Sequence, residues 1–226
     1  MVISPLKENQ SETKTDKKVT LHVSEGIAHV VLSNPPTNLM DEAWSTQTQE
    51  IIDRLGALAE AKEIRGVVLS SNGRHFSAGA NLESLEAAIL GMKQQYLSSM
   101  LENSLYFEKL YDLPVPVVAA IRGVCIGSGL ELALACHYRI ADTRMVMGSV
   151  EATFGIMPGC GATIRLPKIV GAGRALELIM GGRRLDAEEA FAMGLVSEVV
   201  HHSELITKAI EYIDRLSPWY EQVANG

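Results

Sequence analysis

Residues 117–142 read VVAAIRGVCIGSGLELALACHYRIAD, and this stretch indicates the fold class more clearly than any other. It begins with an apolar run, 117–121, that is typical of a buried β-strand. A glycine-rich loop follows, then small, helix-compatible residues at 129–136 and a second strand-like run at 138–141. A strand, a loop, a helix and a further strand in this order favour the α/β class.

The same kinds of element continue on both sides of this stretch. Toward the N-terminus the pattern predicts two strands joined by a turn, a helix capped by Asp41, a strand and a second long helix: 19–23, 27–32, 41–61, 66–69 and 92–112. Toward the C-terminus it predicts helices at 173–180, 187–193 and 204–216. No linker interrupts the pattern, so we predict one domain, 18–226. Residues 1–17 are polar and we expect a disordered arm there.

Composition argues against several classes of protein. With 226 residues, 47% of them hydrophobic, the chain can bury a sizeable core. A net charge of −7 disfavours a general nucleic-acid surface, and an anionic ligand would need a local basic patch. No apolar run reaches the roughly 18 residues of a membrane span. Cys125, Cys136 and Cys160 have no metal-site spacing, which is typical of reduced thiols in the cytoplasm, and we expect no metal site.

Two glycine-rich loops follow predicted strands. They read NGRHFSAGA at 72–80 and GVCIGSG at 123–129. Small residues expose backbone N–H groups, and two such groups from separate loops would form an oxyanion hole. The alternative is that these glycines only permit tight packing, and spacing alone favours that alternative. Neither loop matches a Walker loop or a dinucleotide fingerprint.

Two carboxylates stand in apolar, glycine-containing surroundings. Glu131 lies in GSGLELALAC, and Glu151 lies in MGSVEATFGIMPG. A carboxylate is costly to bury unless it is paired or catalytic. Each could instead be a helix-start glutamate favoured by the helix dipole. Because two occur in similar settings, each after a predicted loop, we interpret them as a candidate acid/base pair.

Other candidate bases and nucleophiles are weaker. His75 and His137 are isolated, so core or surface positions are the simpler interpretation. Ser77 and Ser128 have no neighbouring histidine and aspartate in sequence, and GSG is not a G-x-S-x-G elbow. Cys125 lies between apolar residues with no adjacent basic side chain, which predicts a buried, inert thiol.

Four segments together resemble one known family. They are HFSAGANLESL at 75–85, IRGVCIGSGLELALACHYRIAD at 121–142, GSVEATFGIMPGCGATIRLPKIVG at 148–171 and GGRRLDAEEAFAMGLVSEVV at 181–200. In order and spacing they are similar to the enoyl-CoA hydratase/isomerase, or crotonase, family, over residues 19–217. The resemblance implies an α/β fold built as a spiral of ββα units, usually assembled as homotrimers or homohexamers.

The resemblance also implies a site. Ala80, after the glycine of SAGA, and Ser128, three residues before the first glutamate, would supply two oxyanion N–H groups. Glu131 and Glu151 fall on the positions of the acid/base glutamates of hydratases. The residues implied to bind the thioester and its pantetheine arm are Ala78, Ala80, Asn81, Leu82 and Ser128.

The implied activity is hydration or dehydration of an enoyl thioester. Acyl-CoA is then the substrate, and no cofactor is needed. Three alternatives stay open: an enzyme for a carrier-protein-bound acyl chain, as in polyketide branching; a Δ3,Δ2-enoyl-CoA isomerase; and a non-catalytic assembly protein. Isomerases often lack the first glutamate, and an assembly protein predicts loss of one or both. This chain has both Glu131 and Glu151, which favours a hydratase.

Three positions depart from the family pattern. Hydratases commonly have glycine at the position of Ser128, and proline at the position of Val150. Family members usually continue for another helix or two beyond the position of Gly226, so we expect a domain shortened at its C-terminus. In those family members the additional helices cover the site or a neighbouring subunit's ligand. The sequence therefore leaves open how the coenzyme A end is held and how trimers contact.

Overall fold

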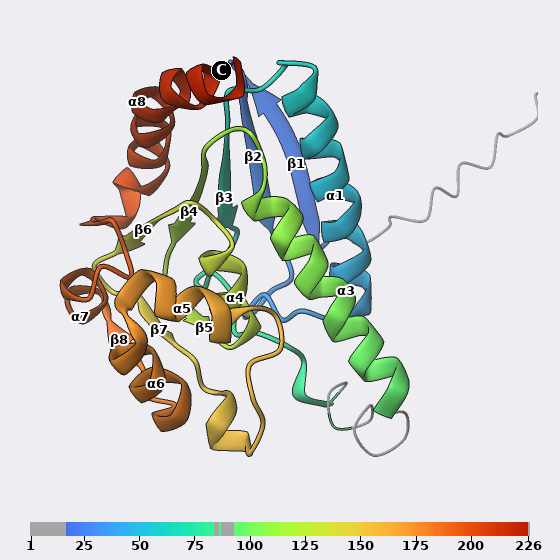
Figure 1. Cartoon of the computed structure of the whole chain (residues 1–226), viewed down its shortest axis with the longest axis vertical. Helices are drawn as coiled ribbons and strands as arrows, with labels where there is room; N and C mark the ends of the chain where they lie inside the picture. The colour runs from blue at the N-terminus through green and yellow to red at the C-terminus, as the bar shows by residue number, and fades with distance from the viewer. Residues whose placement is uncertain (1–16, 84–85, 87–92, 226) are drawn as a thin grey trace, which may run out of the picture.

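The computed structural model describes residues 17–83, 86 and 93–225, which form two mixed β-sheets surrounded by helices (Figure 1). The main sheet has the strand order β1-β2-β3-β4-β6-β9: Val19–Ser24, Ile27–Leu32, Gly66–Ser71, Val117–Ile121, Tyr138–Asp142 and Glu198–Val200. β1 is antiparallel to β2, and every other neighbouring pair is parallel. The smaller sheet has the order β5-β7-β8: Val124–Ile126, Val146–Gly148 and Leu185–Asp186.

Helices connect these strands and cover the main sheet. Among the described residues the named α-helices are α1, α3, α4, α5, α6, α7 and α8: Glu42–Glu60, Lys93–Tyr111, Ser128–Leu134, Ala162–Val170, Ala172–Gly181, Ala187–Ala192 and Leu205–Asn225. Two short 3-10 helices, η1 and η2, span Glu151–Phe154 and His202–Glu204.

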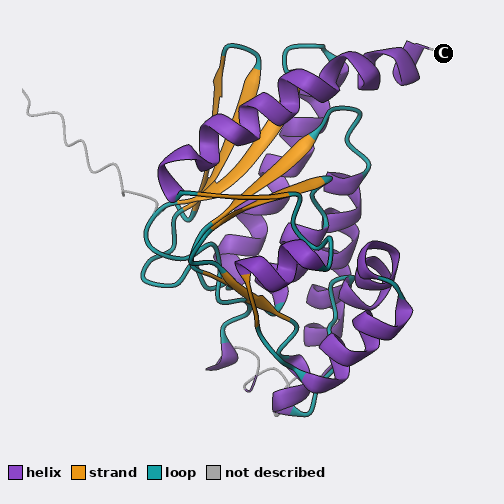
Figure 2. Cartoon of the chain, turned by 90° about the vertical axis from the view of Figure 1, so that its left-hand side faces the viewer, coloured by secondary structure: helices purple, strands orange, loops and turns teal. Residues whose placement is uncertain are grey.

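The main sheet is buried on both faces, which explains the continuous apolar run in β4. Val117, Ala119 and Ile121 face the larger core, to which α1 and α3 contribute. Val118 and Ala120 face a smaller core that α8 closes. Figures 1 and 2 show α8 along one face of the sheet and α1 on the opposite side. A strand buried on both faces needs apolar residues at every position rather than at alternate ones.

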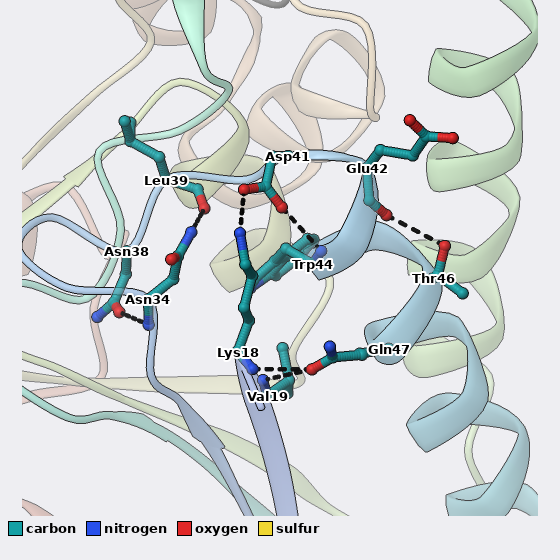
Figure 3. A network of polar contacts seen from close by, with 10 residues as sticks. All are labelled: Lys18, Val19, Asn34, Asn38, Leu39, Asp41, Glu42, Trp44, Thr46 and Gln47. Carbon is teal, nitrogen blue, oxygen red and sulfur yellow. Dashed lines mark hydrogen bonds and ion pairs between the residues drawn. The ribbon is translucent and has the colours of Figure 1, made fainter. Parts of the chain in front are cut away.

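A polar network fixes the start of α1 against β1 (Figure 3). The Asp41 carboxylate caps the helix by accepting the Trp44 N–H at 2.9 Å and also pairs with the Lys18 ammonium. The Gln47 side chain accepts the N–H groups of Lys18, at 2.8 Å, and Val19, at 3.2 Å. The cap predicted at Asp41 is therefore present, and the same side chains join the first strand to the first helix.

The α/β class is confirmed, but the structure differs from the predicted elements in several places, and the short strands β7, β8 and β9 were not predicted. Val124–Ile126, predicted to be loop, is strand β5 because it pairs with β7. Helix α5 was not predicted, because Pro158–Gly161, which precedes it, has the composition of a turn. The last helix does not end at 216 but continues through Pro218, whose fixed φ fits a helix at the cost of one backbone donor. The predicted arm lies, except for residue 17, outside the described residues.

Candidate active site

The two glycine-rich loops meet backbone to backbone. Gly79 has a φ of +86°, and a Cβ there would lie 2.9 Å from the Ile126 carbonyl oxygen and 3.2 Å from the Ser128 nitrogen. Ser77 pairs in parallel with Cys125 just before this contact, through hydrogen bonds to Val124 and Ile126. Any residue other than glycine at position 79 would force the two loops apart.

The N–H of Ala80 points toward the second loop. The Gly79 carbonyl accepts the Met40 N–H at 2.9 Å, on the opposite side of the segment. Because a trans peptide places its C=O and N–H in opposite directions, the following N–H, that of Ala80, points away from Met40. That is the side on which Ser77 pairs with β5.

The N–H of Ser128 is also available. The Gly127 carbonyl accepts the Glu131 N–H at 3.1 Å, the first bond of α4, so the N–H of Ser128 in the same peptide points out of the helix. Within the described part of the chain, the N–H groups of Ala80 and Ser128 donate to no acceptor. Both residues are partly exposed. The structure thus brings the two predicted donors to one place.

Glu131 lies one turn along α4 and is almost fully buried, with 1% exposure. Its Oε1 accepts the N–H of Cys160 at 2.7 Å and of Ala162 at 3.1 Å, at the start of α5. Burial raises the pKa of Glu131 to about 7, and the charge of Glu151 adds to the rise. The two N–H groups and the Arg165 charge act in the opposite direction. Near neutral pH this carboxyl can therefore both give and take a proton.

Glu151 opens η1 and is also buried. The Ser149 hydroxyl donates to its Oε2 at 2.9 Å, and its Oε1 lies 3.7 Å from the place that a Cβ on Gly127 would occupy. The Gly127 N–H donates to the Gly148 carbonyl at 3.1 Å, which holds the end of β7 beside the start of α4. Burial raises the pKa of Glu151, while the Ser149 hydroxyl lowers it. The Glu151 carboxyl thus lies beside Gly127, near enough to Glu131 for its charge to raise the pKa of that second carboxyl.

The sequence did not reveal what holds Glu131. Its partners are backbone N–H groups from the segment Cys160–Ala162, which is itself held by Arg165. The Arg165 guanidinium donates to the Cys160 carbonyl at 3.1 Å and pairs with Glu108 of α3 at 2.5 Å. N–H groups at a helix start bind carboxylates, but almost any residue type can supply them, so no side chain marks these donors in the sequence.

The residues implied for thioester binding surround Ala80. Ala78 donates its N–H to Thr37 and is partly exposed, and the Asn81 side chain accepts the Glu83 N–H at 3.0 Å. Leu82 is 49% exposed. Residues 84–85 and 87–92, which follow, lie outside the described residues. The structure therefore places Ala78–Leu82 at the contact between the two glycine-rich loops and along its edge.

The weaker candidates have structural roles. Nδ1 of His75 and of His137 accepts the N–H of Val124 and Val117, respectively. Ser77 is buried and donates its hydroxyl to the Asn38 carbonyl. Burial raises the pKa of the Cys125 thiol well above its usual range, as expected for an inert thiol. In the part of the chain that the structure describes, no three His, Cys, Asp or Glu side chains form a metal-binding group, and no helix has the length and apolar character of a membrane span.

Comparison with known proteins identifies the family. Residues 22–223 match the family model of the enoyl-CoA hydratase/isomerase proteins. The chain belongs to the crotonase family. This match covers both loops, both glutamates and most of the predicted domain.

Solved crotonase structures have the same fold. An enoyl-CoA hydratase from Bacillus anthracis is 34% identical, with a TM-score of 0.81, covering 92% of this chain and 83% of that one. DspI from Pseudomonas aeruginosa is 31% identical, with a TM-score of 0.82 and coverage of 93% and 84%. A protein described as a putative enoyl-CoA hydratase/isomerase from Mycobacterium abscessus is 32% identical, with a TM-score of 0.79 and coverage of 88% and 76%. The crotonase-type fold class is therefore confirmed.

The raised pKa of Glu131 predicts a dependence of stability on pH. The folded-state pKa of about 7 exceeds the ordinary value of 4.5, so the folded state binds more protons between these values. Stability is therefore lost as pH rises from about 4.5 to 7, by at most about 3 kcal/mol. Glu131→Gln stays neutral and keeps an oxygen for both N–H groups. The measurement is the free energy of unfolding in urea at pH 4.5 and at pH 8. The difference between the variant and the wild type should shift in favour of the variant from pH 4.5 to pH 8. If the stabilities of the variant and the wild type changed with pH in parallel, the raised pKa of Glu131 would be contradicted. Glu50→Gln, at an exposed position on α1, is the control.

Proposed function

We propose that this crotonase-family protein hydrates, or dehydrates, the double bond of an enoyl-CoA thioester. The observation that carries the proposal is the meeting of four groups: the unoccupied N–H donors of Ala80 and Ser128 and the buried carboxyls of Glu131 and Glu151. Acid/base chemistry beside an enolate needs this combination, two aligned donors and two carboxyls of raised pKa. The similarity to a hydratase from Bacillus anthracis supports the same reaction.

The mechanism follows from these positions. The thioester carbonyl accepts the N–H groups of Ala80 and Ser128, which stabilise the charge that builds on its oxygen as water adds at the β-carbon. Losing one such donor typically costs about 3–4 kcal/mol. Glu131, fixed by two backbone N–H groups, orients the water and takes its proton. Glu151 gives a proton to the α-carbon. In the reverse direction the same groups exchange roles and remove water.

The first test is an activity assay. A panel of enoyl-CoA esters that differ in chain length and branching is offered, and loss of the ultraviolet absorbance of the conjugated thioester is followed. We expect hydration of at least one ester. The same acyl groups on a carrier protein form a second arm, and 3-enoyl esters form an isomerase arm. Activity in either of these arms without hydration in the first would replace the proposal with that alternative.

We infer that the protein works in a reducing compartment such as the cytoplasm. Cys125, Cys136 and Cys160 are buried, and no disulfide joins any two of them. Thiols in this state are usual where glutathione and thioredoxin keep proteins reduced.

The glutamate pair gives the sharpest prediction for the reaction. Acid or base catalysis by a positioned carboxyl is typically worth about a hundred- to ten-thousandfold. Glu131→Gln and Glu151→Gln should therefore each lower kcat at least about a hundredfold with the fold intact, as judged by circular dichroism. Because both act on one water and one double bond, the double variant should lose much less than the product of the single losses. Full activity in either single variant would remove that residue from the mechanism.

Exchange of the α-proton with deuterated solvent separates the two roles. If Glu151 moves that proton, Glu131→Gln should retain more exchange than Glu151→Gln. The opposite ranking would reverse the assignment of donor and water-orienting group.

The backbone donor at Ser128 can be tested independently of its side chain. Ser128→Gly keeps the N–H and should keep at least about a tenth of the activity, a loss of no more than about 1.4 kcal/mol. Ser128→Pro removes the N–H and should abolish turnover. Proline is tolerated at the first position of a helix, and thermal melting checks that the variant is folded. If the glycine variant were as inactive as the proline variant, the hydroxyl rather than the backbone would carry the role.

The outer surface predicts a homo-oligomer. Large apolar side chains are exposed on η1, α5, α6 and α7 and the loop between η1 and α5: Phe154, Met157, Ile164, Leu176, Met180 and Phe191. We expect a second copy of the chain to cover them, in a trimer or hexamer, since closed symmetry is the usual solution. Light scattering at micromolar concentration measures the mass. Leu176→Glu should dissociate the assembly, whereas Leu101→Glu, equally exposed on α3, should not. A stable wild-type monomer would contradict this expectation.

A further inference from the structure

A cavity of about 440 Å³ opens at the carboxyl ends of four neighbouring strands of the main sheet. Arg74 follows β3, Arg122 follows β4, Arg144 follows β6 and His202 follows β9, and all four residues line the cavity. These strands run parallel, so their carboxyl ends meet at one edge. In open α/β sheets this edge is where ligands usually bind.

The cavity is separate from the glutamate site. The segment that begins at Arg74 and the one that begins at Gly123 run in the same direction and pair through Ser77 and Cys125. The cavity lies at the start of this pair, and Ala80 and Ser128 lie at its end. A Cβ on Gly123 would lie 2.2 Å from the Arg74 carbonyl oxygen, so glycine is needed to hold the two strand ends together at the cavity.

We propose that this cavity binds a phosphate group carried by a small molecule. Three arginines from three strand ends line it, in a chain whose net charge is −7. Like charges gathered in this way repel one another unless an anion lies among them. Guanidinium is the side chain best suited to phosphate, because its planar set of donors matches two oxygens at once.

These three arginines make few interactions with the rest of the described protein. Across the described ranges, none of Arg74, Arg122 and Arg144 forms an ion pair with a carboxylate. Arg122 makes one side-chain hydrogen bond, to the Ser71 carbonyl at 3.1 Å, and a guanidinium has five donors. Most of the donors in the cluster are therefore available to a ligand.

The one carboxylate in the lining is occupied locally. Asp142 is buried, and its Oδ1 accepts the Arg144 N–H at 2.7 Å and the Thr143 hydroxyl at 3.2 Å. It shapes the turn that carries Arg144. Three guanidiniums outnumber this single carboxylate, so the cavity keeps a positive potential, which attracts anions.

Titration calorimetry with sodium phosphate on the full-length chain, at low ionic strength, tests the proposal. We expect one site with a Kd of about 1 mM or tighter, and a rise in melting temperature with phosphate concentration. Arg144→Glu should raise this Kd at least tenfold. Arg144 is exposed, so folding should be unaffected. Arg74→Ala, at a second exposed position, should also weaken binding.

Arg54→Glu, exposed on α1, is the matched control because it changes the net charge by the same amount. An equal loss in this control, or no binding by the wild type at 10-fold the expected Kd, would overturn the proposal. Coenzyme A is the second titrant. If it displaces phosphate and Arg144→Glu prevents this, the phosphates of the coenzyme are the source. If phosphate binds unchanged in its presence, the ligand is a separate phosphate compound. Neither result depends on hydratase activity, so failure here leaves the proposed reaction standing.

Discussion

The backbone contact between Gly79 and the Ile126–Ser128 turn is the constraint on which the candidate site depends. No side chain fits between the two loops, so the first can pair with β5 while α4 begins directly beside it. The directions of the two free N–H groups follow from this arrangement. The position of Glu131, one helical turn into α4, follows from it as well. The hydrogen bond from the Gly127 N–H to the Gly148 carbonyl brings Glu151 close to Gly127. One close approach of main chain thus positions four groups from three segments.

Burial accounts for what the sequence could and could not predict of the fold. β4 and residues 66–69 of β3 have no polar side chain, since both faces of the main sheet are covered, and that pattern is visible without a structure. β5, β7 and β8 are only two or three residues long and form because partners distant in sequence are available. Their residues carry no periodic pattern of their own. Helix α5 was hidden for a similar reason, because Pro158–Gly161 resembles an ordinary turn.

The site also contains residues that the sequence could predict and groups that it could not. Glu131 and Glu151 were identifiable because a charged group in an apolar stretch needs a reason to be there. The groups that hold Glu131 were not, because they are main-chain N–H groups, 29 and 31 residues away, and any residue type except proline could supply them. The same holds for Ala80, which was found by resemblance. Backbone donors leave no mark on residue identity except the glycines that let them approach.

Helix α8 has a consequence for how the molecule is made. Leu205, Ala209 and Ile213 recur at four-residue spacing and pack on one face of the main sheet. Ile213 fills the space above Gly66, where a Cβ would lie 2.3 Å from its Cγ2. Because α8 follows every strand in chain order, a ribosome releases the whole sheet before its cover. The nascent chain therefore carries an open apolar face, and chaperones have access to that face until α8 emerges and docks.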